Sequence, residues 1–189
     1  MTVSATPYWI DLKDEIFYDP LFGLFGGNNN YDKTRRRGIE LEDSVDLAKF
    51  FDFGPVNKVE LVNNFTYQQA EFNGGANDGK EIPGVPQHQF SAGVNMELNS
   101  RYKFSMMGHY VGNQYPINDT LNVTSPVKPY ITVDTKLTYD RNPFSMFVAV
   151  NNIFNEQYFS YVVKAAGSTT RDYFPAQERS FNVGASVKF

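Results

Sequence analysis

Hydrophobic and polar residues alternate along several segments of this chain, and the C-terminal segment 179–189 shows the pattern most clearly. One set of alternate positions is apolar and the other is polar or small. The apolar set consists of Phe181, Val183, Ala185, Val187 and Phe189. Segments 90–99 and 131–140 repeat the pattern. A period of two residues predicts β-strands with one apolar face.

Further segments are expected to form strands, although their alternation is less regular. They are 4–18, 33–50, 56–72, 102–111 and 144–151. Asp43 and Asn63 interrupt otherwise apolar faces in two of them. Either a β-bulge or a strand that extends beyond a bilayer would account for these two residues. Together with the regular segments, this predicts about eight strands.

The connections between these segments alternate between short and long. The short turns, rich in Gly, Pro, Asn, Asp and Ser, are 51–55, 99–101 and 140–143. The long connections are 19–32, 73–87, 112–129 and 155–178. In an antiparallel up-and-down meander, this alternation places every long loop at one end of the sheet. Outer-membrane β-barrels have this asymmetry, with short periplasmic turns and long extracellular loops.

The residues on the strand faces favour an all-β transmembrane barrel wall over a soluble sheet. The regular segments have the length, about 9–11 residues, that crosses a bilayer when a strand is tilted. The apolar faces of the last strands carry no Lys or Arg, and either residue would cost about 2–4 kcal/mol at the bilayer midplane. Aromatic residues lie near strand ends, as in an interfacial girdle. A soluble β-sandwich with one buried face is the alternative.

The amino-acid composition disfavours several other classes of protein. Aromatic residues make up 16% of the chain, which disfavours disorder, and the net charge of −4 provides no basic field for nucleic acid. The chain has no cysteine for disulfides or thiolate chemistry. Its longest apolar run, 146–150, is far shorter than the roughly 20 residues of a transmembrane helix. The first ten residues lack the basic and apolar regions of a signal peptide.

Three groups of motifs follow one another along nearly the whole chain. They are 11–16 with 32–41, then 82–94, and finally 148–155 with Tyr158, 173–175, Arg179 and Phe189. Together they resemble the C-terminal region of TonB-dependent outer-membrane receptors. The barrel of that family has 22 strands and a plugged lumen. The resemblance therefore implies that residues 1–189 form a C-terminal part of such a barrel, without the plug domain, the energy-coupling segment and the N-terminal strands.

The same resemblance implies a transporter for a scarce ligand, above all a ferric siderophore. We expect the bacterial outer membrane as the location, with the C-terminus in the periplasm. The implied partners are outer-membrane lipid and lipopolysaccharide, the barrel assembly machinery, the absent plug and N-terminal strands, and TonB acting through the plug. The alternative is a complete eight-stranded outer-membrane barrel with a structural or adhesion role.

The last strand also resembles the assembly signal of outer-membrane proteins. That signal combines a polar residue, a glycine and spaced hydrophobic residues, and it ends in an aromatic residue. Asn182, Gly184, Val187 and Phe189 occupy these places. Val187 departs from the pattern, since an aromatic residue is more usual there. Alternatively, Phe189 only anchors a strand end.

Asparagine side chains in the segment 151–155 can satisfy backbone groups at the end of a strand, and the loop that follows contains candidates for ligand contact. The candidates are Tyr158, Tyr161, Tyr173 and Arg171. Aromatic loop residues also pack without binding anything, so a packing role stays open for these tyrosines. Residues 35–37, three consecutive arginines, lie at the long-loop end of a strand. They are expected to meet anionic lipid headgroups or an anionic ligand, or to form a hydrated strand end.

No catalytic, cofactor or metal site is predicted. Aligning the apolar faces pairs Leu98 with Tyr102, which places His88 on the apolar face and His109 on the polar face. The two histidines of the chain therefore point apart, whereas a metal site needs ligands that converge. An enzyme is not expected.

Overall fold

The computed structural model describes residues 1–19 and 27–188. Its main element is an eight-stranded antiparallel sheet in the order β1-β2-β3-β4-β5-β6-β7-β10. The strands of this sheet are β1 (Thr2–Asp19), β2 (Gly27–Asp46), β3 (Val56–Phe72), β4 (His88–Leu98), β5 (Tyr102–Val111), β6 (Tyr130–Arg141), β7 (Phe144–Asn151) and β10 (Ser180–Val187). A separate hairpin consists of β8 (Phe159–Lys164) and β9 (Arg171–Pro175).

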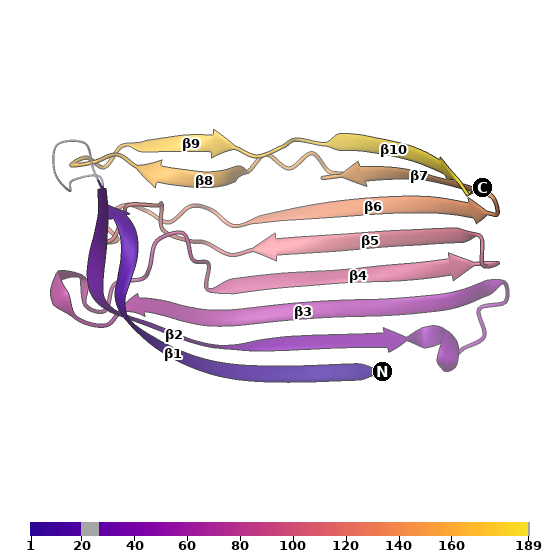
Figure 1. The fold of residues 1–189 in the computed structure, drawn as a ribbon, viewed down its shortest axis with the longest axis horizontal. Coiled ribbons are helices and arrows are strands. Elements are labelled where there is room, and N and C mark those ends of the chain that lie inside the picture. Colours follow the sequence, from indigo (N-terminus) through magenta and orange to yellow (C-terminus); the bar gives the residue numbers. More distant parts are fainter. Residues whose placement is uncertain (20–26, 189) are drawn as a thin grey trace.

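The predicted up-and-down meander is confirmed. Consecutive strands pair with each other, and β10 pairs with β7 because the β8–β9 hairpin intervenes in sequence. Leu98 lies opposite Tyr102, as the apolar periodicity predicts. The short turns lie at one end of the sheet, and the long connections of the described residues lie at the other (Figure 1).

Several predicted boundaries were wrong. β1 and β2 continue further into the first long connection, and residues 20–26 of that connection lie outside the described residues. β2 ends at Asp46, because residues Leu47–Lys49 form the 3-10 helix η1 and Asp46 Oδ1 accepts a hydrogen bond from the Ala48 amide at 3.2 Å. The connection 155–178 contains the β8–β9 hairpin, so it is not an irregular loop.

Asp43 and Asn63 interrupt the apolar faces of β2 and β3 without a β-bulge. The register between β2 and β3 is continuous across them, and they lie directly opposite each other. Asn63 Nδ2 donates a hydrogen bond to Asp43 Oδ2 at 3.0 Å. Two polar side chains that would each be unsatisfied next to apolar neighbours therefore satisfy each other.

One face of the sheet exposes apolar side chains on successive strands, and we call it the outer face. Among its members, Phe181 is 69% exposed and Val183 is 76% exposed. Other exposed apolar residues of this face are Val3, Leu41, Leu61, Phe90, Met106, Ile131, Leu137, Met146 and Val148. No second layer within the described residues covers them, which excludes the soluble sandwich for this part of the chain.

A small cluster of buried apolar residues lies at the long-loop end. Ala70, Phe72 and Ile82 are buried, and Phe17 and Tyr31 pack against them. The Phe17 and Tyr31 rings meet edge-on with centroids 5.2 Å apart. This cluster stabilises the extended ends of β1, β2 and β3 beyond the apolar part of the outer face.

The described sheet is open, with β1 at one edge and β10 at the other. A closed eight-stranded barrel would require these two strands to pair, and the described residues show no such pairing. The alternative of a complete small barrel is therefore not supported. Among the described residues, no helix has the length and apolar character to cross a membrane.

Lipid exposure of the outer face is tested by Leu137→Arg. Leu137 is 49% exposed on the outer face, and an arginine there is expected to cost about 2–4 kcal/mol if it faces the bilayer midplane. We expect loss of the folded protein from outer membranes, measured by heat-modifiable migration. Thr138→Arg, on the opposite face, is the matched control and should assemble. Equal assembly of both variants would contradict lipid exposure.

Candidate functional site

The long connections form a pocket of about 450 Å³ next to the β8–β9 hairpin. Three segments line it: 125–130, 156–159 and two residues of β9, Arg171 and Tyr173. The Tyr130 and Tyr158 rings stack with centroids 4.2 Å apart, and the Phe159 and Tyr173 rings lie 4.8 Å apart. Two pairs of aromatic rings therefore form part of the pocket wall.

Positive charge accompanies these rings. Arg171 Cζ lies 5.7 Å from the centre of the Tyr173 ring, and Arg171 Nη1 donates a hydrogen bond to the Ser125 carbonyl at 2.8 Å. Lys128 also lines the pocket, together with the carboxylate of Glu156. Aromatic faces with two cations suit a flat or conjugated ligand that carries negative charge.

The structure brings three of the four predicted loop residues together. Tyr158, Tyr173 and Arg171 line the pocket. Tyr161 does not line it, because its ring stacks on Phe174 with centroids 4.2 Å apart. Tyr130 and Lys128 were not predicted from the sequence. Tyr130 begins β6 and Lys128 precedes that strand, so neither lies in the 155–178 connection that contains the predicted candidates.

Buried polar residues hold these loops in place. Asp119 is 1% exposed, and its carboxylate accepts hydrogen bonds from the Val123 and Thr124 amides at 3.0 and 2.9 Å. The Asn122 side chain bonds both the amide and the carbonyl of Glu81, which ties two long connections together. Asn152 is also buried. Its side-chain amide donates a hydrogen bond to the Glu156 carbonyl and accepts one from the Glu156 amide, so it satisfies backbone groups at the end of the strand, as the sequence predicts.

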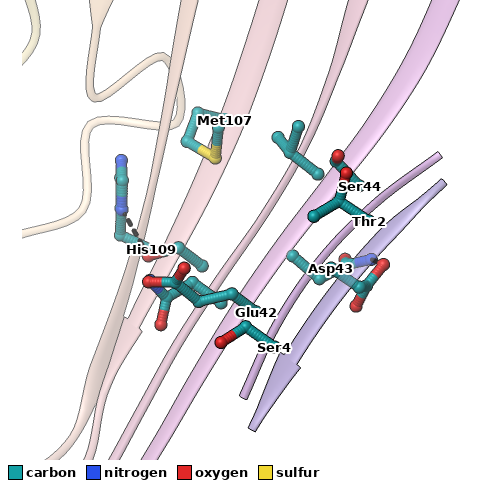
Figure 2. Close-up of a pocket in the computed structure, with 11 residues that line it drawn as sticks. Thr2, Ser4, Glu42, Asp43, Ser44, Met107 and His109 are labelled. Atoms are coloured by element: carbon teal, nitrogen blue, oxygen red, sulfur yellow. Dashed lines mark hydrogen bonds between the residues drawn. The ribbon is translucent and has the colours of Figure 1, made fainter. Parts of the chain in front are cut away.

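The inner face of the sheet is hollowed by a second cavity of about 420 Å³ (Figure 2). Its lining comes from β1 to β5, so the inner face is concave. Most of the lining residues are small or polar, among them Thr2, Ser4, Glu42, Ser44, Asn64, Ser91 and His109, and Val62 and Met107 add apolar surface. The contrast with the apolar outer face is the one that a barrel wall requires between lumen and lipid.

The two histidines lie on opposite faces, as predicted. His109 belongs to the inner face, where its Nδ1 lies 2.9 Å from Ser91 Oγ. His88 belongs to the outer face and lies opposite Tyr67, with ring centroids 5.1 Å apart. Within the described residues, no group of three or more His, Cys, Asp or Glu side chains could hold a metal ion.

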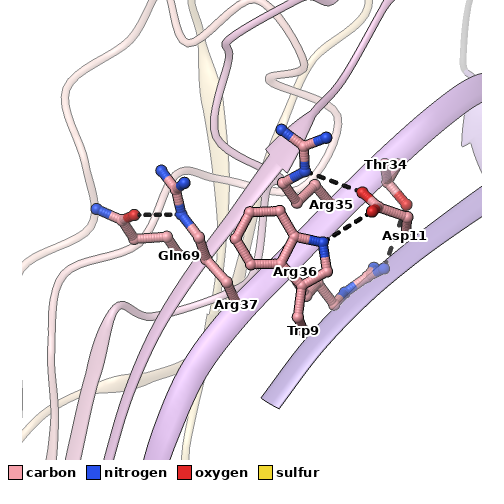
Figure 3. A network of polar contacts seen from close by, with 7 residues as sticks. All are labelled: Trp9, Asp11, Thr34, Arg35, Arg36, Arg37 and Gln69. Atoms are coloured by element: carbon pink, nitrogen blue, oxygen red, sulfur yellow. Dashed lines mark hydrogen bonds and ion pairs between the residues drawn. The ribbon is translucent and has the colours of Figure 1, made fainter. Parts of the chain in front are cut away.

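The three consecutive arginines divide between the two faces of β2 (Figure 3). Arg35 and Arg37 lie on either side of the Trp9 ring, at 5.1 and 5.7 Å from its centre. Arg36 points the other way and forms two hydrogen bonds with Glu15, at 2.9 and 2.6 Å. The sequence treated these residues as one cluster, but only two of them share a face.

The Arg36–Glu15 pair lies beyond the apolar part of the outer face. Burial alone would raise the pKa of the Glu15 carboxyl, but the hydrogen bonds from Arg36 and Thr34 outweigh it and leave that pKa below its ordinary value. Glu15 reaches the inner face because Asp14 has a φ of 57°, which rotates the chain and reverses the side-chain alternation of β1. This pair therefore stabilises the extended end of the sheet.

The predicted assembly-signal residues divide in the same way in β10. Asn182 and Gly184 lie on the inner face and Val187 on the outer face, while Phe189 lies outside the described residues. Side-chain packing within the sheet also explains why a glycine occupies position 184. The Phe147 ring of β7 covers it so closely that a Cβ atom at Gly184 would lie 2.3 Å from Phe147 Cε1.

The chain belongs to the family of TonB-dependent receptor-like β-barrels. The model of this family, described as "TonB dependent receptor-like, beta-barrel", matches residues 1–153. The matched range includes the first two motif groups and most of the opening segment of the third. Membership in this family places the chain in the bacterial outer membrane, and comparison with curated protein sequences found no match.

Solved structures show the same fold. The ferric yersiniabactin uptake receptor FyuA from Yersinia pestis aligns with a TM-score of 0.76 and 20% identity, over 99% of this chain and 27% of that one. The ferric-catecholate import receptor Fiu from K12 E. coli, in its closed form, aligns with a TM-score of 0.70 and 22% identity, over 99% and 25%. The copper transporter OprC aligns with a TM-score of 0.73 and 16% identity, over 99% and 28%. The chain thus spans about a quarter of the length of these proteins.

The close contact at Gly184 generates a prediction about stability. Gly184→Val places new methyl groups against the Phe147 ring, and overpacking of this kind typically costs about 1–3 kcal/mol. We expect a lower urea midpoint for the folded full-length protein, and partial recovery in the Gly184→Val/Phe147→Ala double variant. Ala185→Val, which adds methyl groups on the outer face, is the control and should unfold like the wild type.

Two outcomes of this experiment would contradict the packing explanation. In the first, Gly184→Val would be as stable as the wild type. In the second, assembly would fail in Gly184→Val and Phe147→Ala would not relieve the failure, which would favour direct recognition of Gly184 during assembly.

Proposed function

We propose that residues 1–189 are the C-terminal part of the barrel of an outer-membrane TonB-dependent transporter that takes up a ferric siderophore. The observation that carries this proposal is the pairing of an exposed apolar outer face with a concave polar inner face, below a pocket built from the long loops. A wall of this kind separates lipid from lumen and holds a ligand-binding surface outside the cell. FyuA and Fiu, whose names specify ferric yersiniabactin and ferric catecholates, support an iron complex as the ligand.

The proposed role of this chain within the transporter is ligand capture and not catalysis. Tyr158, Tyr173 and Arg171 are the residues that we assign to ligand contact, and Lys128 and Tyr130 join them on the strength of the pocket geometry. Ferric siderophore complexes are commonly conjugated and anionic, which matches aromatic walls with two cations. Tyr161 packs on Phe174 and is left out of the contact set.

The proposal includes the remaining partners of such a transporter. TonB would act through a plug domain that fills the concave inner face, and further strands would pair with the edges of β1 and β10. The short-turn end and the C-terminus would lie in the periplasm. The barrel assembly machinery would recognise β10 through Asn182, Gly184, Val187 and Phe189, and lipopolysaccharide would surround the long-loop end of the outer face.

Ligand capture is tested by Arg171→Gln in the full-length protein. Loss of a charge-assisted contact typically costs about 1.5–3 kcal/mol, so we expect affinity for the bound iron complex to fall roughly tenfold or more. Binding and uptake are measured with radioactive iron as its citrate, catecholate and yersiniabactin complexes. The wild type identifies which complex is bound.

Tyr161→Phe is the matched control, because it changes a residue of β8 outside the pocket and keeps the ring stack with Phe174. It should bind like the wild type. The proposal fails if the wild-type protein transports none of these iron complexes. The assigned site fails if the wild type transports one and Arg171→Gln binds it unchanged.

A further inference from the structure

We propose that Lys13, Lys33, Arg35 and Arg37 form a cationic cluster that binds the phosphate of a lipid headgroup in the outer leaflet. The cluster lies on the outer face of β1 and β2, directly beyond the apolar residues of that face. This inference rests on the proposed function for its membrane orientation and names the lipid contact that the orientation implies.

The strand register brings the four cations together. Three consecutive cross-strand pairs on the outer face are Trp9 with Arg37, Asp11 with Arg35, and Lys13 with Lys33. Successive pairs are two residues apart along each strand, so the three pairs extend over about 13 Å of strand. Arg36 takes no part, because it points to the inner face and is bound by Glu15.

The charges within this cluster are only partly balanced. Asp11 forms an ion pair with Arg35, between Nε and Oδ1 at 2.9 Å. Arg37 Nε donates a hydrogen bond to the neutral Gln69 at 2.8 Å. Lys13 and Lys33 lie directly opposite each other, both exposed, and neither forms an ion pair within the described residues. Like charges that face each other across two strands are destabilising, so an external anion between them would relieve the repulsion.

The guanidinium groups of both arginines are presented in a fixed orientation. The Trp9 ring holds Arg35 and Arg37 on its two sides, and its Nε1 donates a hydrogen bond to Asp11 Oδ2 at 2.7 Å (Figure 3). The bonds described for these arginines use the ε nitrogens. The terminal nitrogens are the groups that bind phosphate in paired hydrogen bonds.

The position of the cluster identifies a lipid as the source of the phosphate. On β1 the outer face is apolar from Val3 to Pro7. On the antiparallel strand β2 it is apolar from Ile39 to Val45, apart from Asp43. The cations begin in the next cross-strand pair, where Trp9 is 59% exposed. Exposed tryptophan marks the boundary between hydrocarbon and headgroups. A lipid whose tails cover the apolar face therefore places its phosphate at the level of these four side chains.

The test uses the full-length protein, purified in detergent and mixed with micelles of phosphatidylcholine that contain phosphatidic acid. Native mass spectrometry measures the affinity for phosphatidic acid in the wild type and in Lys13→Gln/Lys33→Gln. Lys49→Gln/Lys80→Gln is the matched control, since it removes the same charge from exposed lysines outside the cluster. Lys13→Arg/Lys33→Arg keeps the charge, and Lys33→Gln alone is used if the double variant is not recovered folded.

We expect Lys13→Gln/Lys33→Gln to lose affinity for phosphatidic acid about thirtyfold, as the usual contributions of two basic residues beside an anionic surface imply. The control and the arginine variant should stay within about twofold of the wild type. Inorganic phosphate at matched ionic strength should not displace the lipid. Equal losses in the glutamine variant and the control, or complete displacement by inorganic phosphate, would overturn the proposal. Uptake of the iron complex is measured separately, so these results stand whether or not the protein transports iron.

Discussion

The structure depends on one constraint, which is that every backbone N–H and C=O group in hydrocarbon needs a partner within the protein. An antiparallel meander meets this constraint strand by strand, from the β1–β2 pair to the β7–β10 pair. Once the backbone is satisfied in this way, successive side chains must point alternately to lipid and to the lumen. The exposed apolar outer face and the concave polar inner face are two consequences of the same pairing.

The same constraint explains the exceptions on each face. Asp43 and Asn63 lie on the outer face, and their mutual hydrogen bond removes most of the penalty for unsatisfied polar groups. On the inner face, the Phe147 ring fills the space over Gly184, and Lys136 lies 4.7 Å from the centre of that ring. Beyond the bilayer the alternation is free to change, and it does so at Asp14. The rigid wall then positions the long loops, whose buried Asp119 and Asn152 hold the pocket walls in place.

The strand order, the face of each regular strand and the segregation of long loops could be predicted from the sequence, because all three follow from a two-residue period and turn composition. The β8–β9 hairpin could not, since its strands are short, at six and five residues, and its pairing includes an irregularity between Phe159 and Tyr161. Three of the four loop candidates lie in one pocket, but Tyr130 and Lys128 were missed because their proximity to Tyr158 and Arg171 depends on contacts between distant loops. Side-chain alternation along a strand predicts that Arg36 lies on the opposite face from Arg35 and Arg37. The contact of Arg36 with Glu15 depends on the reversed side-chain alternation after Asp14, and no local sequence pattern predicts that reversal.

Spin-label accessibility along β10 tests the central claim most directly. This chain contains no cysteine. Single cysteines at positions 181–183 and 185–187 are introduced in turn and labelled with a nitroxide in the membrane-inserted full-length protein, and Gly184 is left unchanged because a Cβ atom there would meet the Phe147 ring. Alternating lipid contact predicts high collision rates with dissolved oxygen at 181, 183, 185 and 187, and low rates at 182 and 186. Accessibility to oxygen that is uniform along the strand, or highest at 182 and 186, would contradict the assignment of the outer face to lipid.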